Sequence, residues 1–117
     1  MSAAEDLIFR YHEAVGRRDI EAVMALMHPQ ARFEDFLEGG EITGSTVVRA
    51  FYERLFDTLA PELDVIAITI QPDGRMRADI QVATHDRSGH VWSDTRSYAL
   101  YAVVEGLIHG IELQPGV

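Results

Sequence analysis

The sequence predicts an α+β fold in which three N-terminal helices pack on one face of a curved, mainly antiparallel sheet. Three observations predict it. Apolar residues recur at helical spacing in three stretches of the first half. From residue 63 onward they alternate with polar residues or form continuous runs, which is typical of strands. Short turn sequences separate these runs, and strands joined by tight turns pair antiparallel.

The first predicted helix begins at the capping box Ser2-Ala3-Ala4-Glu5. Its apolar face consists of Leu7, Ile8, Tyr11, Ala14 and Val15. Gly16 interrupts the pattern, and Asp19 is a good N-cap for a second helix over residues 20–27. Pro29 disfavours helical backbone at His28, so we expect the second helix to end there.

A short strand is predicted over residues 31–36, followed by a turn over 37–41. Residues 42–44 then lead into a third helix that Ser45 caps and Pro61 ends. The apolar face of this helix consists of Val47, Val48, Phe51, Tyr52, Leu55, Phe56 and Leu59.

The second half predicts four strands joined by hairpins. The strands cover residues 63–71, 75–85, 90–104 and 107–113. Pro72-Asp73-Gly74, Asp86-Arg87-Ser88-Gly89 and Glu105-Gly106 supply the turns between them. We expect residues 1–117 to form one domain, because this length suits a single hydrophobic core.

The net charge and composition of the chain limit the kinds of molecule that it is expected to bind. A net charge of −9 without a basic patch argues against nucleic acid and against an anionic membrane surface. The chain has no apolar run long enough to span a bilayer, no recognisable signal peptide and no cysteine. We therefore expect a cytoplasmic protein whose partner is a neutral small molecule or another protein chain. The histidines form no metal-binding pattern, and no cofactor motif is present.

The segment Arg32-Phe33-Glu34-Asp35-Phe36 carries the most functional information. It ends a short apolar strand with carboxylates. A carboxylate at the rim of an apolar cavity can act as a general base. The alternative is that Glu34 and Asp35 mark a strand end in water.

Several short motifs, in their order and spacing, resemble one superfamily. They are Arg10-Tyr11, Arg18-Asp19-Ile20-Glu21-Ala22, the 29–35 segment, Gly44, Ala50-Phe51-Tyr52 and Glu105-Gly106-Leu107-Ile108. Over nearly its whole length the chain resembles the nuclear transport factor 2-like superfamily, in its SnoaL-like and ketosteroid isomerase-like branch. The resemblance implies a cone, in which a strongly curved sheet and three helices enclose an apolar pocket.

The resemblance to ketosteroid isomerase implies roles for individual residues. Asp35 falls where that family keeps its general base, and Tyr11 where it keeps a tyrosine that donates to the developing oxyanion. Tyr52 falls on a tyrosine that supports the first, and Val15 on a residue of the pocket wall. All four match at one constant offset without a gap. The chemistry implied is removal of a proton next to a carbonyl while hydroxyl donors hold the enolate oxygen.

The chain departs from that family at two places. Met27 stands where the family has a third tyrosine. The family's protonated aspartate on the long strand falls on Tyr98, which could donate one hydrogen bond, or on Ala99, which could not. Loss of one oxyanion donor costs roughly 3 kcal/mol. General enolisation chemistry is therefore a better expectation than steroid isomerisation itself.

Two related branches give further alternatives. Limonene-type epoxide hydrolases have an Arg-x-Asp pair that Arg77-Ala78-Asp79 resembles, but the second carboxylate they need would fall on Leu113. We favour an exposed ion pair for Arg77 and Asp79. SnoaL-like polyketide cyclases use carboxylates for an aldol closure, and Asp94 is a candidate there, although a solvated or dimer-facing sheet residue is the simpler interpretation.

The resemblance thus implies a cofactor-independent isomerase, cyclase or lyase with Asp35, Tyr11 and Tyr52 as its catalytic residues. Residues expected to line the pocket are Val15, Met27, Phe33, Phe51, Phe56, Trp92 and Tyr98. Each also has a purely structural interpretation as a core or sheet-face residue, and Phe51 rather than Tyr52 could point inward. The competing hypothesis is a non-catalytic ligand-binding or protein-interaction module. We expect an apolar ligand and a homodimer formed through the outer face of the sheet.

Overall fold

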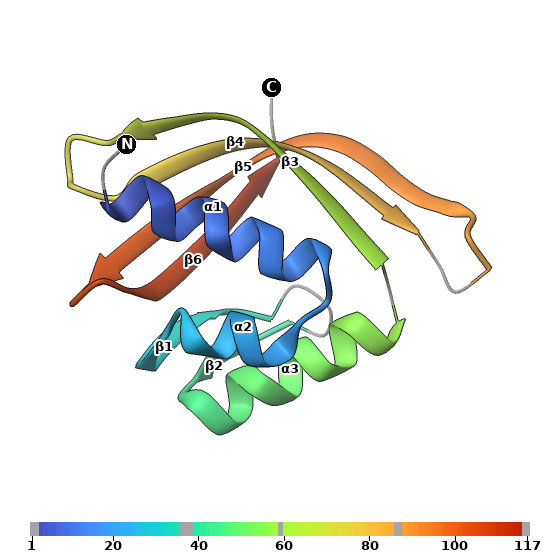
Figure 1. The fold of residues 1–117 in the computed structure, drawn as a ribbon, viewed down its shortest axis with the longest axis horizontal. Helices are drawn as coiled ribbons and strands as arrows, with labels where there is room; N and C mark the ends of the chain where they lie inside the picture. Colours follow the sequence, from blue (N-terminus) through green and yellow to red (C-terminus); the bar gives the residue numbers. More distant parts are fainter. Residues whose placement is uncertain (1–2, 36–38, 59, 86–87, 116–117) are drawn as a thin grey trace.

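One six-stranded sheet dominates the structure, with strand order β2-β1-β6-β5-β4-β3. The computed structural model describes residues 3–35, 39–58, 60–85 and 88–115, and within these ranges it has three helices and six strands (Figure 1). The helices are α1 (Ala3–Gly16), α2 (Ile20–Ala25) and α3 (Ser45–Thr58). The strands are β1 (Met27–Glu34), β2 (Glu41–Thr43), β3 (Ala60–Ile70), β4 (Met76–His85), β5 (Val91–Val104) and β6 (Leu107–Pro115). The predicted α+β class is confirmed.

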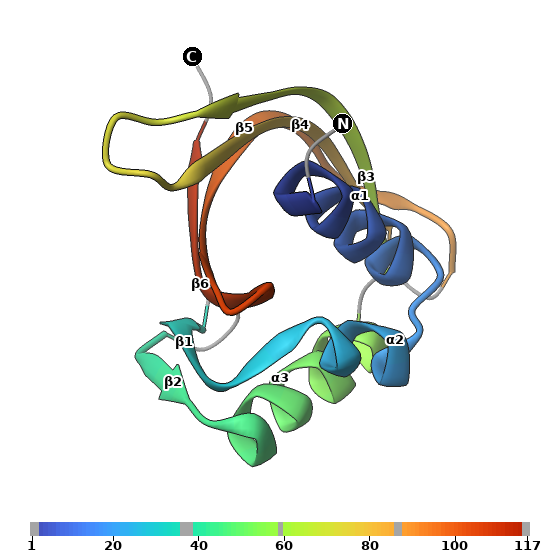
Figure 2. The ribbon, with the colours of Figure 1, turned by 60° about the vertical axis from the view of Figure 1, so that its left-hand side comes forward.

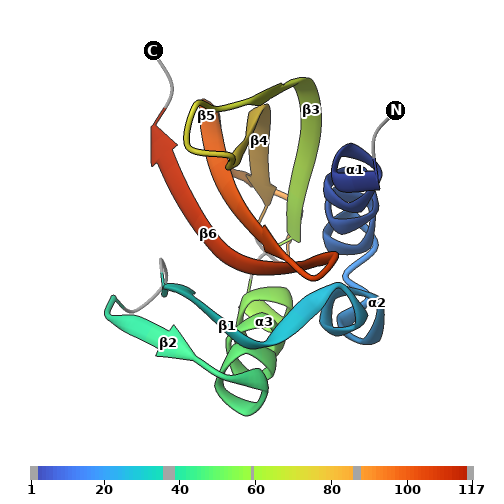
Figure 3. The same cartoon turned by 90° about the vertical axis from the view of Figure 1, so that its left-hand side faces the viewer.

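The long strands β3 to β6 follow one another in the sheet as antiparallel neighbours, as sequential hairpins require. In Figure 2 these strands curve around the side of the molecule that α1 occupies. Helix α3 lies against β1, and α2 lies between the other two helices (Figure 3). The concave face of the sheet is therefore the face that the helices cover.

The inward face of the long strands follows the expected alternation. Met76, Ala78 and Ile80 of β4 are buried, and their neighbours Ala99 and Tyr101 of β5 are buried as well. Alternate residues on these strands face outward, because successive side chains of a strand point to opposite faces. The core lies between this inward face and the apolar faces of α1 and α3.

The second helix is shorter than predicted. Asp19 is its N-cap as expected, and its carboxylate accepts a hydrogen bond of 3.1 Å from the Ala22 backbone N–H. The helix ends at Ala25, however, and Met27 already belongs to β1, whereas the sequence predicts helix to residue 27. Pairing of Met27 with Ile108 in β6 explains the earlier end, because this parallel ladder holds the backbone extended.

Strand β1 is consequently longer than the predicted strand over residues 31–36. Its ladder with β6 is irregular between Met27 and Arg32, and Pro29, which has no N–H to donate, lies in that interval. A second difference is β2, which pairs antiparallel with β1 where the sequence predicts a turn and a connection. Gly44, at φ 92°, lies just before α3, and the Val48 N–H donates to its carbonyl, so α3 is capped by Gly44 rather than by Ser45.

Ser2 and Phe36, both used in the sequence predictions, lie outside the described residues. Across the ranges that the structure describes, no helix is long and apolar enough to cross a membrane.

Candidate active site

Two tyrosines from different helices meet in the interior. Tyr11 of α1 and Tyr52 of α3 are both buried, and their hydroxyl oxygens lie 2.6 Å apart. Tyr11 lies one turn after Leu7 and Ile8 on the buried face of α1, which is why its ring points inward. The sequence left open whether Phe51 or Tyr52 points inward. Both side chains are buried, so both do.

These two hydroxyls are protonated at neutral pH. Burial raises the pKa of Tyr11 to about 12, although the hydrogen bond between Tyr11 and Tyr52 partly offsets this. Burial and the neighbouring Tyr11 also raise the pKa of Tyr52 well above its usual range. Two hydroxyls carry two protons, and the bond between them uses one. Within the described residues neither hydroxyl has another hydrogen-bond partner, so one proton of the pair is available to an acceptor in the interior.

Asp35 follows the last residue of β1 and is 3% exposed, whereas Glu34 before it is exposed. The alternation of β1 explains this difference, since Ala31, Phe33 and Asp35 share its buried face. The backbone of Asp35 is fixed by two hydrogen bonds: its N–H donates to the Gly40 carbonyl at 2.8 Å, and its carbonyl accepts from the Gly39 N–H at 2.7 Å. A buried carboxylate is thus held at the point where the chain leaves the sheet.

Arg54 is a cationic partner of Asp35 that sequence reasoning missed. Its guanidinium donates to Asp35 Oδ2 at 2.8 Å, and its side chain is 42% exposed. Arg54 also lines an open hollow of about 570 Å³, together with Ile20, Glu53, Phe56 and Asp57. The pair places a cation directly beside the Asp35 carboxylate, so a ligand would compete with Arg54 for that carboxylate.

A second buried polar pair was also missed. The hydroxyl of Tyr101 in β5 lies 2.8 Å from Nε2 of His12 in α1, and both residues are buried. Burial lowers the pKa of His12 to about 4, so the imidazole is neutral at neutral pH. Its Nδ1 is buried and has no hydrogen-bond partner among the described residues. Two features of the sequence could have indicated that both residues are buried. His12 lies four residues after Ile8 on the same helix face, and Tyr101 lies two residues after Ala99 on the same strand face.

Three of the residues predicted to line the pocket, Phe33, Phe51 and Phe56, have rings close to that of Tyr52. The ring centroids of Phe33 and Phe51 are 5.5 Å apart, and those of Tyr52 and Phe56 are 5.7 Å apart. Val15 and Met27 are buried in the same core. Trp92 and Asp94 belong to β5, but their side chains lie outside the described part of the chain.

Tyr98 does not face the interior, so the prediction that it lines the pocket is wrong. It pairs with Asp79 on the outer face of the sheet, and the Arg77 guanidinium carbon lies 4.0 Å from the centre of its ring. Ala99 faces inward instead, and it has no polar group to donate. The expected long-strand donor is therefore absent at both positions considered.

Arg77 and Asp79 form an ion pair of 2.9 Å on the outer face of β4, on either side of the buried Ala78. This agrees with the favoured interpretation of a surface ion pair. It removes the arrangement on which the epoxide hydrolase alternative depends, because neither side chain faces the core.

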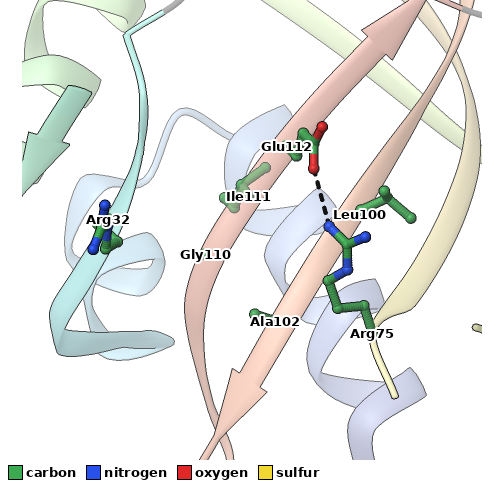
Figure 4. A pocket seen from close by; sticks show the side chains of 7 residues that line it. All are labelled: Arg32, Arg75, Leu100, Ala102, Gly110, Ile111 and Glu112. Carbon is green, nitrogen blue, oxygen red and sulfur yellow. Dashed lines mark hydrogen bonds and ion pairs between the residues drawn. The ribbon is translucent and has the colours of Figure 1, made fainter. Parts of the chain in front are cut away.

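A shallow hollow of about 180 Å³ lies on the outer face of the sheet (Figure 4). Small residues of β5 and β6, Ala102 and Gly110, leave this space between the longer side chains around it. At one side of the hollow, Arg75 donates to Glu112 at 3.0 Å. Glu112 therefore serves an external ion pair and supplies no carboxylate to the interior.

No group of three or more acidic or histidine side chains in the described ranges is placed to hold a metal ion. Among the described residues, the interior contains the carboxylate of Asp35, the imidazole of His12 and the phenolic hydroxyls of Tyr11, Tyr52 and Tyr101.

The sequence match agrees with this geometry. A family model described as a SnoaL-like domain matches residues 8–110. The chain belongs to the SnoaL-like domain family. This confirms the predicted membership of the nuclear transport factor 2-like superfamily. No curated protein matches this SnoaL-like chain in sequence.

Solved structures share the fold at low identity. A candidate polyketide cyclase from Xanthomonas campestris is 23% identical, with a TM-score of 0.81 over 95% of this chain and 88% of its own. A Mycobacterium tuberculosis protein solved in complex with estradiol-17beta-hemisuccinate is 18% identical, with a TM-score of 0.85 over 100% and 96%. The Δ5-3-ketosteroid isomerase of a Mycobacterium species is 18% identical, with a TM-score of 0.84 over 99% and 95%. At these identities the likeness shows that this SnoaL-like chain has the same fold.

Proposed function

We propose that the protein binds an apolar small molecule carrying a carbonyl group and acts on it as a cofactor-independent isomerase or cyclase. Asp35 would remove a proton from the carbon next to the carbonyl. The observation that carries this proposal is that the chain contains both a buried carboxylate, paired with Arg54, and a buried tyrosine pair with one proton to donate. Carboxylate and hydroxyl supply the two groups that enolisation needs.

The side chains present can accept and return the proton that the reaction moves. The Asp35 carboxylate accepts the proton, and the electron pair of the broken C–H bond moves to give an enolate. The free proton of the Tyr11–Tyr52 pair forms a hydrogen bond to the enolate oxygen, where negative charge develops. In an isomerase, Asp35 returns the proton to another carbon of the same molecule. In a cyclase, the enolate carbon attacks a second carbonyl carbon of the ligand, the π bond of that carbonyl breaks, and the alkoxide so formed takes up the proton from Asp35.

The fold relatives support the ligand class. One of them was solved with a steroid derivative, and another is named for isomerising ketosteroids. Phe33, Phe51 and Phe56, packed around Tyr52 in this chain, would offer a similarly apolar environment.

The second candidate function is ligand binding without catalysis, and Arg54 favours it. The guanidinium of Arg54 already occupies Oδ2 of Asp35, so this oxygen is not available to a substrate proton while the pair is intact. Catalysis would require the side chain of Arg54 to release Asp35 when a ligand binds. Its partial exposure beside an open hollow leaves room for that movement.

Deuterium exchange at the α-carbon of 2-tetralone, an apolar cyclic ketone, tests the proposal. We expect the wild-type protein to accelerate exchange and Asp35→Asn to lower the enzymatic rate about 100-fold, because the amide cannot take up the proton. Loss of the α-proton signal in the NMR spectrum measures the rate. Asp79→Asn on the outer face is the matched control and should leave the rate unchanged. Equal rates in wild type and Asp35→Asn would leave binding without catalysis as the function.

We also propose that the protein forms a homodimer through the outer face of β4, β5 and β6. Outward residues of β5, namely Leu100, Ala102 and Val104, form an apolar strip there, and Val104 is 40% exposed. We expect sedimentation equilibrium to give twice the chain mass, and Leu100→Arg to give the monomer mass. A wild-type protein that sediments as a monomer at micromolar concentration would contradict this assembly.

A further inference from the structure

The proposed reaction makes no use of the His12–Tyr101 pair, although it is as deeply buried as the Tyr11–Tyr52 pair. Its two residues come from opposite ends of the chain, α1 and β5, and bond across the core at 2.8 Å. The ring of Tyr11 touches both members, with centroids 5.4 Å from His12 and 5.7 Å from Tyr101. The two polar pairs are therefore neighbours in one interior.

The unpaired Nδ1 of His12 indicates which way the proton of this bond points. A neutral imidazole carries its proton on one nitrogen only. If Nδ1 carried it, a buried N–H would lack an acceptor, which is rare in folded proteins. If Nε2 carries it, Nδ1 is a bare acceptor, and an unpaired acceptor is tolerated more often. The second arrangement is favoured, so Nε2–H donates to the Tyr101 oxygen.

This direction leaves the hydroxyl proton of Tyr101 without a role in the pair. Within the described residues, His12 is the hydrogen-bond partner of the Tyr101 hydroxyl, and it occupies the oxygen rather than the proton. Burial raises the pKa of Tyr101 well above its usual range, so the proton stays on the hydroxyl at neutral pH. Tyr101 lies two residues from Ala99 in β5, so its side chain faces the interior on the same face of the strand.

We propose that Tyr101, oriented by His12, is a ligand-binding residue that donates a second hydrogen bond to the oxygen of a bound ligand. The ligand class is an apolar molecule whose carbonyl, enolate or phenolate oxygen can accept two hydrogen bonds. One bond comes from the Tyr11–Tyr52 pair and the other from Tyr101. His12 is a positioning residue, since it acts through Tyr101. This inference rests on the proposed ligand site but does not require Asp35 to be catalytic.

The tautomer of His12 tests the first step without any ligand. Nitrogen-15 NMR of the imidazole at neutral pH distinguishes a proton on Nε2 from one on Nδ1. We expect the Nε2–H tautomer in the wild-type protein. A proton on Nδ1 would mean that the Tyr101 hydroxyl donates its proton to Nε2 of His12 and has none left for a ligand, and the inference would be overturned.

Binding of p-nitrophenol, whose anion is an oxygen acceptor on an apolar ring, tests the second step. We expect Tyr101→Phe to weaken binding about tenfold, which corresponds to one lost hydrogen bond. Tyr98→Phe is the matched control, because it removes the same hydroxyl from the other face of the same strand, and it should bind like wild type. Circular dichroism verifies that both variants are folded.

The outcomes separate this inference from the proposed function. If Tyr101→Phe and Tyr98→Phe bind equally well, Tyr101 is not a ligand donor, while the Asp35 proposal is unaffected. If the wild-type protein binds no p-nitrophenol, the interior ligand site itself is overturned. If binding weakens in Tyr101→Phe but exchange is unchanged in Asp35→Asn, the ligand site stands and catalysis by Asp35 fails.

Discussion

Replacing Phe51 by alanine is expected to lower the free energy of unfolding by about 3–5 kcal/mol. Phe51 is fully buried in α3, and its ring packs edge-on against those of Phe33 and Tyr52, with centroids 5.5 Å and 5.2 Å away. Truncation removes these contacts and leaves a cavity that the surrounding rings cannot fill without moving. Chemical denaturation followed by circular dichroism measures the change.

Phe9→Ala is the matched control for this prediction. Phe9 lies on α1 but is 39% exposed, so the same truncation should cost well under 1 kcal/mol. A loss below about 1 kcal/mol for Phe51→Ala would contradict the packing described here. It would mean that the interior around Tyr52 is loosely filled.

Acid is expected to destabilise the protein through His12. The pKa of His12 is about 4 in the folded state because of burial, compared with 6.5 for an exposed histidine. Between these values the unfolded chain binds a proton that the folded chain does not, so stability falls as the pH decreases from 6.5 towards 4. The full loss from this group is about 3 kcal/mol, and above about pH 7 the group has no effect on the slope.

The dependence of unfolding free energy on pH measures this contribution. In His12→Gln the contribution between pH 4 and 6.5 should disappear, whatever the variant's stability at pH 7. His90→Gln removes an exposed histidine that bonds Ser88, and it should keep the wild-type slope. Identical slopes in wild type and His12→Gln would show that His12 is not buried as a neutral imidazole.

The parts of the fold that depend on local patterns were predictable. The four long strands and their turns follow from period-two alternation and from Pro-, Asp- and Gly-rich turn sequences, and their observed bounds differ by only a few residues. The end of α2 and the existence of β2 were not predictable in this way. Both depend on pairing with β1, whose own position is set by β6 at the other end of the chain.

The candidate site was predictable where helical spacing determines which face is buried. Tyr11 and Tyr52 lie on apolar helix faces, so their burial follows from sequence. His12–Tyr101 and Asp35–Arg54 join residues from different elements, and their contacts depend on the curvature of the sheet and on the path of the chain after β1. Arg54 in particular has the spacing of an ordinary solvent-facing helix residue, so nothing in the sequence ties it to Asp35.

The parallel pairing of β1 with β6 has a consequence for how the chain folds. The Ile108 N–H donates to the Leu26 carbonyl at the start of the parallel ladder between β1 and β6. Strand β1, near the N-terminus, can therefore pair only when β6, near the C-terminus, is in place. Closing so long a loop costs entropy before any contact compensates for it, and proteins rich in such contacts fold slowly. We therefore expect the β3–β6 meander to assemble first, with β1, and the carboxylate at its end, among the last parts to become ordered.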